Sequence, residues 1–309
     1  MAISAKVVAD SISEEGVRIT TFELEYPRFI HAEFMTHRLF SRNAQSSRAV
    51  PVEKMLEQIR KNPANPIHWG KNQPGMSAKE TSEDPVDTGG WGGFPMGNRE
   101  YPWHAWDLGA CSAADLAERF ANAGYHKQIV NRLTEPFAHI KVVCTATEYD
   151  NFFWLRRHPD AQPEIQELAE QMWQAREAST PMMLYAGDWH LPYYKDGYYI
   201  NAGTFDTDSD GHNHILGDAM MISSSCCAQV SYRKLDDSLE KARKIYDMLV
   251  ESKPVHASPF EHQATPIVYA EEHGVTHTDR KGNHWSANFR GWIQYRQFLP
   301  DNTCWIYKG

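Results

Sequence analysis

A strand-like run that leads straight into a dense block of cationic and polar side chains constrains this chain most strongly. Residues 18–30 alternate apolar and polar side chains, as a half-buried strand does. The block at residues 36–48 reads Thr-His-Arg-Leu-Phe-Ser-Arg-Asn-Ala-Gln-Ser-Ser-Arg. Arginine forks and serine hydroxyls both donate hydrogen bonds to phosphate oxygens. We therefore predict a loop or helix start at a strand end that binds a phosphorylated ligand; the alternative is an ordinary solvated turn.

The composition predicts a folded, soluble protein. The 309 residues are 41% hydrophobic, which is enough to bury a core, and no apolar run is long enough to span a bilayer. The first eleven residues lack the basic start and apolar centre of a secretory signal. Five cysteines, an odd number without paired-ligand spacing, argue against a disulfide framework. We expect a cytoplasmic protein that has no membrane partner.

Charge and histidine spacing narrow the class of ligand. A formal net charge of −9 disfavours nucleic acid as a partner, because many Lys and Arg supply most of that affinity. A mononucleotide needs only a local cationic pocket. Among the 15 histidines, His256 and His262 lie six apart across Pro259, and no pair has a zinc-binding helix spacing. We predict no metal, with a histidine-rich metal hydrolase as an alternative.

The order of periodic segments predicts an α/β (α+β) fold in two parts. Residues 1–180 form the first part, 181–215 an aromatic linker with a small hairpin, and 216–309 the second part. Within the first part, about residues 65–106 show no period, which predicts an insertion, either a lid or a plain surface loop.

Several helices and strands are expected within these parts. Strands are predicted at 139–145 and 263–270, and helices at 112–122, 151–157, 163 onward and 239–250. Asp237 is the expected cap of the last helix. The predicted buried positions are Leu116 and Phe120 in the first helix and Ile165, Leu168, Ala169 and Met172 in the third.

Three separated segments resemble the flavin-dependent thymidylate synthases. The first is the 36–48 block, with His-Arg, seven residues, and then Ser-x-Arg. The second joins Asn131-Arg132-Leu133-Thr134-Glu135-Pro136 to a later Asn151-Phe152-Phe153-Trp154-Leu155-Arg156. The third runs from residue 228 through a helix to the Pro-Phe-Glu-His element at residues 259–262. Each segment is moderately specific, and together they cover most of the chain outside the insertion and the linker.

Order and substitutions set this chain apart from the family pattern. In short members the Pro-Phe-Glu-His element precedes the His-Arg block, whereas here it follows. We expect a permuted or fused chain of two related halves, each a mixed or antiparallel sheet packed with helices, that complete one another within a subunit or across an interface. Residues that differ from the usual family residue are Glu33, Thr36, Ala44 and Thr147. Residues that could restore the lost cations are Arg42, Arg157, Arg290 and Arg296.

The resemblance implies FAD-dependent methylation of dUMP to dTMP, with methylenetetrahydrofolate and NADPH as co-substrates. No Pro-Cys pair, which conventional thymidylate synthesis uses as its nucleophile, occurs in the chain. The cofactor would carry out the chemistry, while the protein would position the substrates and polarise the reacting groups. Short members build each site from several subunits, so we expect a homo-oligomer, a dimer or tetramer, with sites at subunit interfaces.

The resemblance also implies roles for individual residues. Catalytic roles fall to Arg156, which would face the pyrimidine carbonyls, and to Ser46. Residues implied to bind the nucleotide are Gln45, Ser46, Ser47, Arg48, Arg132 and Arg156. Residues implied to bind FAD are His37, Arg38, Asn151, Ser231 and His262. Two alternatives keep the nucleotide: a flavin-dependent pyrimidine nucleotide hydroxymethylase, and a catalytically idle nucleotide-binding relative.

Overall fold

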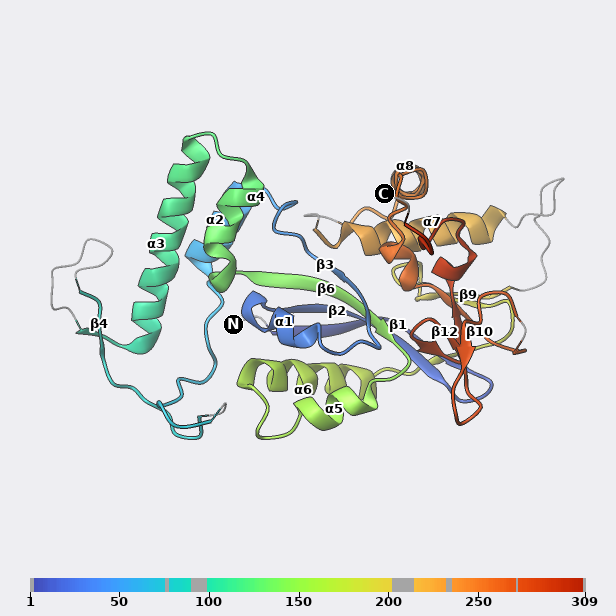
Figure 1. The fold of residues 1–309 in the computed structure, drawn as a ribbon, viewed down its shortest axis with the longest axis horizontal. Coiled ribbons are helices and arrows are strands. Elements are labelled where there is room, and N and C mark those ends of the chain that lie inside the picture. Colours follow the sequence, from blue (N-terminus) through green and yellow to red (C-terminus); the bar gives the residue numbers. More distant parts are fainter. Residues whose placement is uncertain are drawn as a thin grey trace.

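A five-stranded sheet in the order β3-β6-β2-β1-β7 forms the centre of the molecule (Figure 1). The computed structural model describes residues 3–75, 78–89, 99–201, 214–231, 235–270 and 272–307, without the side chains of His214 and Ser231. β1 (Ser4–Ser13) and β2 (Arg18–Pro27) pair as an antiparallel hairpin. Its turn contains Gly16 with φ of 78°, a backbone conformation that favours glycine. β6 (His139–Ala146) and β3 (Ser41–Ala44) extend one side, and β7 (Met182–Leu184) extends the other.

One face of this sheet is apolar because alternate residues of its strands point to the same side. β2 contributes Phe22, Leu24 and Tyr26, and β6 contributes Ile140, Val142 and Cys144. α5 (Asp150–Arg156) and α6 (Pro163–Glu177) pack on this face (Figure 1). The four predicted core positions of α6 are confirmed, since each has 0% exposure: Ile165, Leu168, Ala169 and Met172. α6 begins at a proline, and the side chain of Gln162 accepts the N–H of Ile165 at 3.0 Å.

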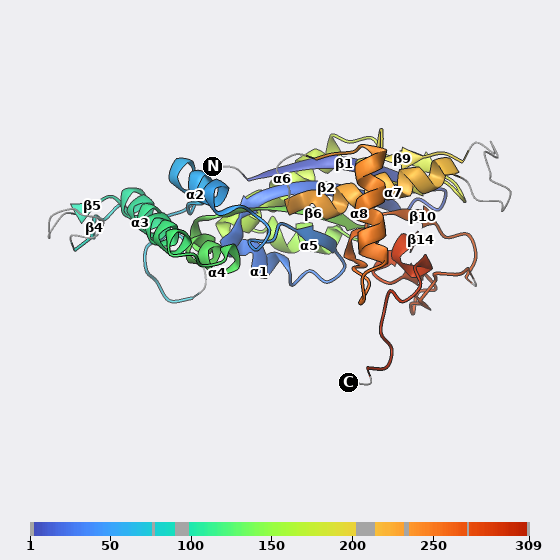
Figure 2. The same cartoon turned by 90° about the horizontal axis from the view of Figure 1, so that it is seen from above.

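The C-terminal part packs against the end of the five-stranded sheet where β1 turns into β2 and where β7 ends (Figure 2). β8 (Trp189–His190), β9 (Tyr198–Tyr199), β10 (Ala264–Pro266) and β14 (Trp292–Gln294) form a second sheet in the order β14-β10-β8-β9. Its core is continuous with β2, because Ile19 packs in one cluster with Ala264 and Trp292. The buried Trp292 indole also donates to the carbonyl of Val17, just before β2, at 3.0 Å. β11 (His277–Thr278), β12 (His284–Ser286) and β13 (Phe289–Arg290) form a third, small sheet.

Two longer helices complete the C-terminal part. They are α7 (His214–Ala228) and α8 (Leu239–Val250), with the 3₁₀ helices η4 (Gln229–Ser231), η5 (Ser258–Glu261) and η6 (Tyr295–Phe298) nearby. The predicted range of α8 is confirmed, but the Asp237 cap is wrong. The hydroxyl of Ser238 accepts the N–H of Lys241 instead, at 3.4 Å.

The chain between β3 and β6 forms a helical arm, which lies to one side of the five-stranded sheet (Figure 1). It comprises α2 (Val52–Lys61), α3 (Pro102–Asn122), α4 (Lys127–Val130) and the 3₁₀ helix η3 (Asn131–Phe137). α3 is longer than predicted and buries small residues, Ala110, Ala114 and Ala117, while Leu116 is 46% exposed. The expected burial of Leu116 is therefore wrong, because the alanine stripe sets the packed face of α3.

The two segments without clear periodicity differ from each other. In the expected insertion, β4 (Val86–Asp87) and β5 (Arg99–Glu100) form a short pair, and residues 102–106 already belong to α3. Most of its Gly-Gly-Trp-Gly-Gly-Phe-Pro run lies outside the described residues. In the expected linker, β8 and β9 form a hairpin, while β7 joins the five-stranded sheet. Residues 182–199 thus contribute strands to both sheets.

A matched pair of leucine substitutions tests the packing of α6 and α3. Leu168→Ala should lower the free energy of unfolding by about 2 to 5 kcal/mol, because it leaves a cavity in a fully buried site. Leu116→Ala, the same chemical change on an exposed face, should change it by no more than about 0.5 kcal/mol. Urea unfolding monitored by circular dichroism measures both, and equal losses would contradict the assigned faces.

Candidate functional site

The His-Arg segment packs directly onto α5, which carries the Asn-Phe-x-x-Leu-Arg motif. The 3₁₀ helix η1 (Arg28–Ile30) and α1 (His31–Phe34) lead from β2 into this segment. The Phe34 and Phe40 rings meet the Phe152 ring of α5 at centroid distances of 5.9 and 5.3 Å. These aromatic contacts hold the polar side chains of the two motifs beside each other.

Arg156, at the end of α5, forms a hydrogen bond and an ion pair with residues of the His-Arg segment and of α1 just before it. Its Nε donates to Nε2 of His37 at 3.0 Å, and its Nη1 forms an ion pair with Oε1 of Glu33 at 2.5 Å. We name Glu33, His37 and Arg156 the first cluster. Two motifs that are more than a hundred residues apart in the chain therefore converge on one guanidinium.

His37 is neutral in this arrangement. Burial, together with the nearby guanidinium groups of Arg156 and Arg42, lowers its pKa to about 4. Since arginine donates to Nε2, the ring proton of the neutral imidazole must sit on Nδ1. The segment is braced further by Arg42, whose Nη1 donates to the carbonyls of Phe34 and His37, each at 3.0 Å.

The Ser-x-Arg end of the block meets the Asn-Arg-Leu-Thr-Glu-Pro segment. The Ser47 hydroxyl donates to Oε1 of Glu135 at 2.7 Å, and Nδ2 of Asn131 donates to the carbonyl of Ser47 at 2.7 Å. Arg28 pairs with the same Glu135 oxygen at 3.3 Å. These bonds fix the loop backbone, while the side chains of Arg48 and Arg132 are exposed.

Residues around the Ser-x-Arg end complete a second cluster. Nearby, Oε1 of Gln45 accepts the N–H of Lys141 at 3.3 Å, and Oγ of Ser46 accepts the N–H of Arg48 at 3.3 Å. We name Gln45, Ser46, Ser47, Arg48 and Arg132 the second cluster. It lies at the opposite end of β3 from the first cluster, and the four residues of β3 span about 10 Å at the usual strand rise. A ligand that touches both clusters must therefore be elongated.

His262 lies behind the sheet, away from both clusters. Thr145 bonds Nδ1 of His262 at 2.8 Å, yet its neighbours Cys144 and Ala146 face α5 on the opposite side of β6. His262 has 0% exposure, and its Nε2 is buried without a hydrogen-bond partner among the described residues. Within one chain the sheet therefore separates His262 from Arg156.

A buried chain of hydrogen bonds continues from His262. Thr145 bonds Thr21 at 2.7 Å, Thr21 bonds Nε2 of His190 at 2.8 Å, and Nδ1 of His190 bonds Ser11 at 2.9 Å. Burial lowers the pKa of both imidazoles to about 3, and for His262 the neighbouring His190 lowers it further. This chain fastens the C-terminal part to the five-stranded sheet.

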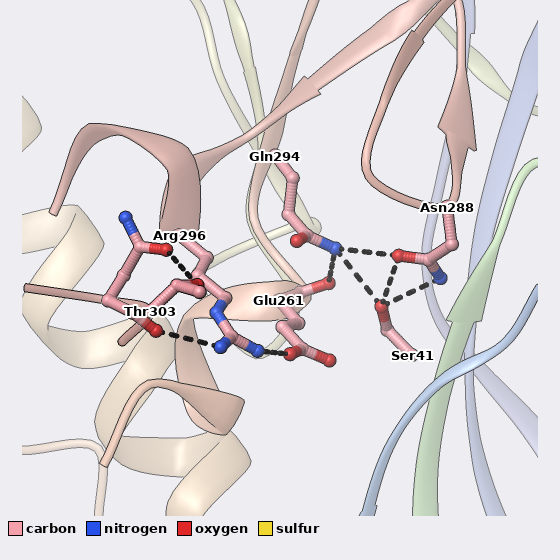
Figure 3. Close-up of polar contacts among 7 residues, drawn as sticks. Ser41, Glu261, Asn288, Gln294, Arg296 and Thr303 are labelled. Atoms are coloured by element: carbon pink, nitrogen blue, oxygen red, sulfur yellow. Dashed lines mark hydrogen bonds and ion pairs between the residues drawn. The ribbon is translucent and has the colours of Figure 1, made fainter. Parts of the chain in front are cut away.

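The Pro-Phe-Glu-His element is fastened to β3 by a second polar network. Figure 3 shows the amide of Gln294 directed at Ser41 and Asn288, to which its Nε2 donates at 3.1 and 3.2 Å. The same Nε2 donates to the carbonyl of Glu261 at 3.3 Å, and the Glu261 carboxylate pairs with Arg296 (Figure 3). The motif's glutamate is thus occupied by an internal ion pair.

The arginines that could replace lost family cations all have partners. Arg157 pairs with Glu170 at 2.8 Å and Arg290 with Glu148 at 2.5 Å, while Arg42 and Arg296 make the contacts described above. Arg290 N–H also donates to the Thr147 hydroxyl at 3.0 Å. None of these guanidinium groups lies free for a ligand within the part of the chain that is described.

A small cavity lies where β3 meets the C-terminal part. It has a volume of about 340 Å³. Its lining residues come from both parts: Arg42, Asn43, Ala44, Ala228, Val230, Leu249, His256, Ser258 and Pro259. The structure thus brings His256 to the strand that joins the two clusters.

Two residues implied for FAD are exposed near the first cluster, and one is not described. Arg38 adjoins His37 in the loop, and Asn151 lies in the first turn of α5. The side chain of Ser231 lies outside the described residues. Asn131, Glu135 and Gln294 organise the site through buried or half-buried bonds. The sequence alone assigned a role to none of them, although Asn131 and Glu135 belong to the second motif that resembles the family.

A sequence profile of the family described as thymidylate synthase complementing protein matches residues 16–182, which is more than half of the chain. The chain belongs to this family. The matched region of the thymidylate synthase complementing protein family contains both clusters and ends before His262. No curated protein matches the sequence.

Solved structures give similar but distant matches. One is the flavin-dependent thymidylate synthase ThyX of Helicobacter pylori complexed with FAD and dUMP, at 17% identity and a TM-score of 0.32, covering 51% of this chain and 67% of that chain. Another is the UMP/dUMP methylase PolB of Streptomyces cacaoi bound with 5-Br UMP, at 16% identity and a TM-score of 0.38, covering 59% and 90%. The same methylase bound with 5-Br dUMP matches at 17% identity and a TM-score of 0.36, covering 59% and 91%.

The described residues contain neither a candidate metal site nor a candidate membrane-spanning helix. No group of three or more His, Cys, Asp or Glu side chains there could hold a metal ion. Nor does any helix in those residues have the length and apolar character needed to cross a bilayer.

The buried histidines predict acid sensitivity. Because their folded-state pKa values lie near 3 and the ordinary value is 6.5, protonation favours the unfolded chain. Their stabilising contribution is complete above pH 6.5 and is lost as the pH falls toward 3, by about 1.4 kcal/mol per pH unit for each histidine. Urea unfolding between pH 7 and 4.5 measures this slope. His262→Asn should make it shallower, whereas the exposed control His158→Gln should leave it unchanged, and identical slopes for all three proteins would contradict the assignment.

Proposed function

We propose that this protein is a FAD-dependent thymidylate synthase that reductively methylates dUMP to dTMP, with methylenetetrahydrofolate and NADPH as co-substrates. The observation that carries the proposal is the contact between Arg156 and His37, since it joins the two motifs expected to bind pyrimidine and flavin. Family membership over residues 16–182 supports the same class of reaction.

The second cluster suits the phosphate of dUMP. Ser46, Arg48 and Arg132 would bind it, with Gln45 and Ser47 as further donors. Glu135 and Asn131 hold the loop backbone, so the exposed guanidinium groups can reach a ligand without reorganising the strand. A loop backbone that is fixed before binding loses less conformational entropy on binding.

Arg156 would face the uracil carbonyls. With its Nε and Nη1 held by His37 and Glu33, the guanidinium has a fixed plane, and its remaining N–H groups can point to a ligand. A fixed donor stabilises negative charge that develops on the ring as carbon 5 becomes a nucleophile. His37 and Glu33 act in this step by positioning Arg156.

The residues beside the first cluster fit a flavin by the chemistry of their donors. Arg38 offers a cation, Asn151 an amide, and His37 a neutral imidazole with its proton on Nδ1, and these groups suit phosphate and ring carbonyl acceptors. When bound, FAD would supply the carbon transfer and the hydride. We place His262 outside this set, because it is fully buried on the far face of the sheet. Ser231 stays a predicted contact.

A second copy of the chain would complete the site. Large apolar side chains surround the first cluster and are exposed: Met35 (45%), Leu39 (41%), Trp154 (75%) and Leu155 (41%). Apolar patches of this kind mark interaction surfaces. We therefore propose a homo-oligomer, a dimer or tetramer. Separately, we propose that the protein acts in the cytoplasm.

One observation favours a second candidate. The ion pair between Glu33 and Arg156 offsets the charge that would stabilise the uracil, which suits a catalytically idle relative that only binds nucleotide. Tight dUMP binding without reduction of bound flavin by NADPH would select this alternative.

Spectroscopy and product analysis test the proposed reaction. The purified protein should be yellow with flavin absorbance, and should convert dUMP to dTMP when given NADPH and methylenetetrahydrofolate. Mass analysis of the nucleotide separates dTMP from a hydroxymethylated product. A colourless preparation that fails to bind added FAD would refute the cofactor assignment.

Two neighbouring arginines provide a matched test of the first cluster. Arg156→Ala should lower turnover by roughly 10²- to 10³-fold while leaving bound flavin in place, because it removes one preorganised donor. Arg157→Ala should leave turnover near that of the unchanged protein, since Arg157 pairs with Glu170 and covers the Trp173 ring. Steady-state dTMP formation measures both, and equal losses would reject the role of Arg156.

A further inference from the structure

A wide groove lies between the insertion and α6, apart from the two clusters. Its volume is about 1110 Å³, above the 300 to 1,000 Å³ of typical small-ligand pockets. Apolar side chains of Phe29, Ile67, Trp106, Pro136 and Pro163 line it. The groove is fixed in place, because the buried carboxylate of Glu164 accepts the N–H of Ile67 at 2.8 Å.

The same chain carries an exposed apolar segment near its C-terminus. Trp305, Ile306 and Tyr307 are 90%, 74% and 87% exposed. Figure 2 shows this C-terminal stretch projecting away from the body. Single exposed apolar residues are ordinary, but three consecutive large ones form a patch that favours a partner surface.

We propose that Trp305, Ile306 and Tyr307 of one copy dock in the groove of a second copy. In both views the C-terminal stretch lies apart from α6 and the insertion, because α6 packs along the five-stranded sheet, the insertion extends away from the C-terminal part, and the stretch leaves the molecule near α8 (Figures 1 and 2). The stretch therefore meets the groove of another copy. Exchange in both directions closes a two-fold dimer without leaving a free docking end.

Charge and area support this occupant. The groove lining carries four carboxylates, those of Asp160, Glu164, Glu167 and Glu170, against the two cations Lys79 and Arg157, so its net charge is negative. Lys308 follows the apolar triplet in the sequence and would complement this charge. The two aromatic side chains bury about 150 to 250 Å² each, and the groove loses a similar area. Two reciprocal contacts then exceed the roughly 1,000 Å² that a specific interface needs. None of the residues of the two clusters lines the groove, so this docking is tested separately from turnover.

Sedimentation velocity of the full chain tests the proposal. Ile306→Asp and Ile67→Asp should each raise the dissociation constant of the assembly at least tenfold, because each buries a charge in the contact. Val86→Asp is the matched control, since Val86 is 46% exposed in the same insertion but lies outside the groove lining. Unchanged assembly in both variants, or a full chain that stays monomeric, would overturn the proposal.

Crosslinking separates this contact from any other interface. In a Cys111→Ser background, a bismaleimide should join the exposed Cys304 of one copy to Ile67→Cys of another and give a covalent dimer. Val86→Cys should give at least tenfold less of this dimer under the same conditions. Equal yields, or no crosslink in an assembled protein, would show that the triplet docks elsewhere and that the groove serves another ligand.

Discussion

The pairing of β3 with β6 fixes the strand whose two ends carry the His-Arg and Ser-x-Arg parts of the clusters. Ser41 to Ala44 each face a residue of β6 in antiparallel register, from Thr145 to Val142. A shift by one residue would turn every side chain of β3 to the opposite face. The polar contacts of Ser41 with Asn288 and Gln294 oppose such a shift, because they would lose their partner (Figure 3). The length of β3 therefore sets the distance between the first cluster and the second.

The two faces of the central sheet differ in polarity. Apolar and aromatic packing fills the face toward α5 and α6, whereas Thr21, Thr145, His190 and His262 fill part of the other face. A buried hydrogen-bonded chain adds directional specificity that apolar packing lacks. It requires neutral imidazoles, so the attachment of the C-terminal part depends on pH. The exposed cations lie away from this chain, where their charge costs no desolvation.

The sequence predicted strongly periodic elements better than it predicted the site. β6, α5, α6 and α8 lie close to their expected ranges, because each carries a clear pattern and a boundary signal. The predicted burial of Leu116 is wrong because alanines form the packed face of α3, and a hydrophobicity pattern gives alanine little weight. The convergence of His37 with Arg156 followed from motif resemblance, since the contact spans a sequence separation that no local pattern can encode. The position of His262 behind the sheet depends on the strand alternation of β6, which only the tertiary structure reveals.

The charge distribution along β3 matches the polarity of a nucleotide. In the first cluster, Glu33 offsets Arg156 and His37 is neutral because its pKa lies near 4, so the net charge there is close to zero. In the second cluster, Arg48 and Arg132 are exposed, and Glu135 is already shared by Arg28 and Ser47. A ligand with an uncharged ring at one end and a dianionic phosphate at the other fits this gradient in one orientation. The ion pair at Arg156 lowers the net charge at the end proposed for the uracil, so the second cluster would attract the nucleotide phosphate more strongly than Arg156 does.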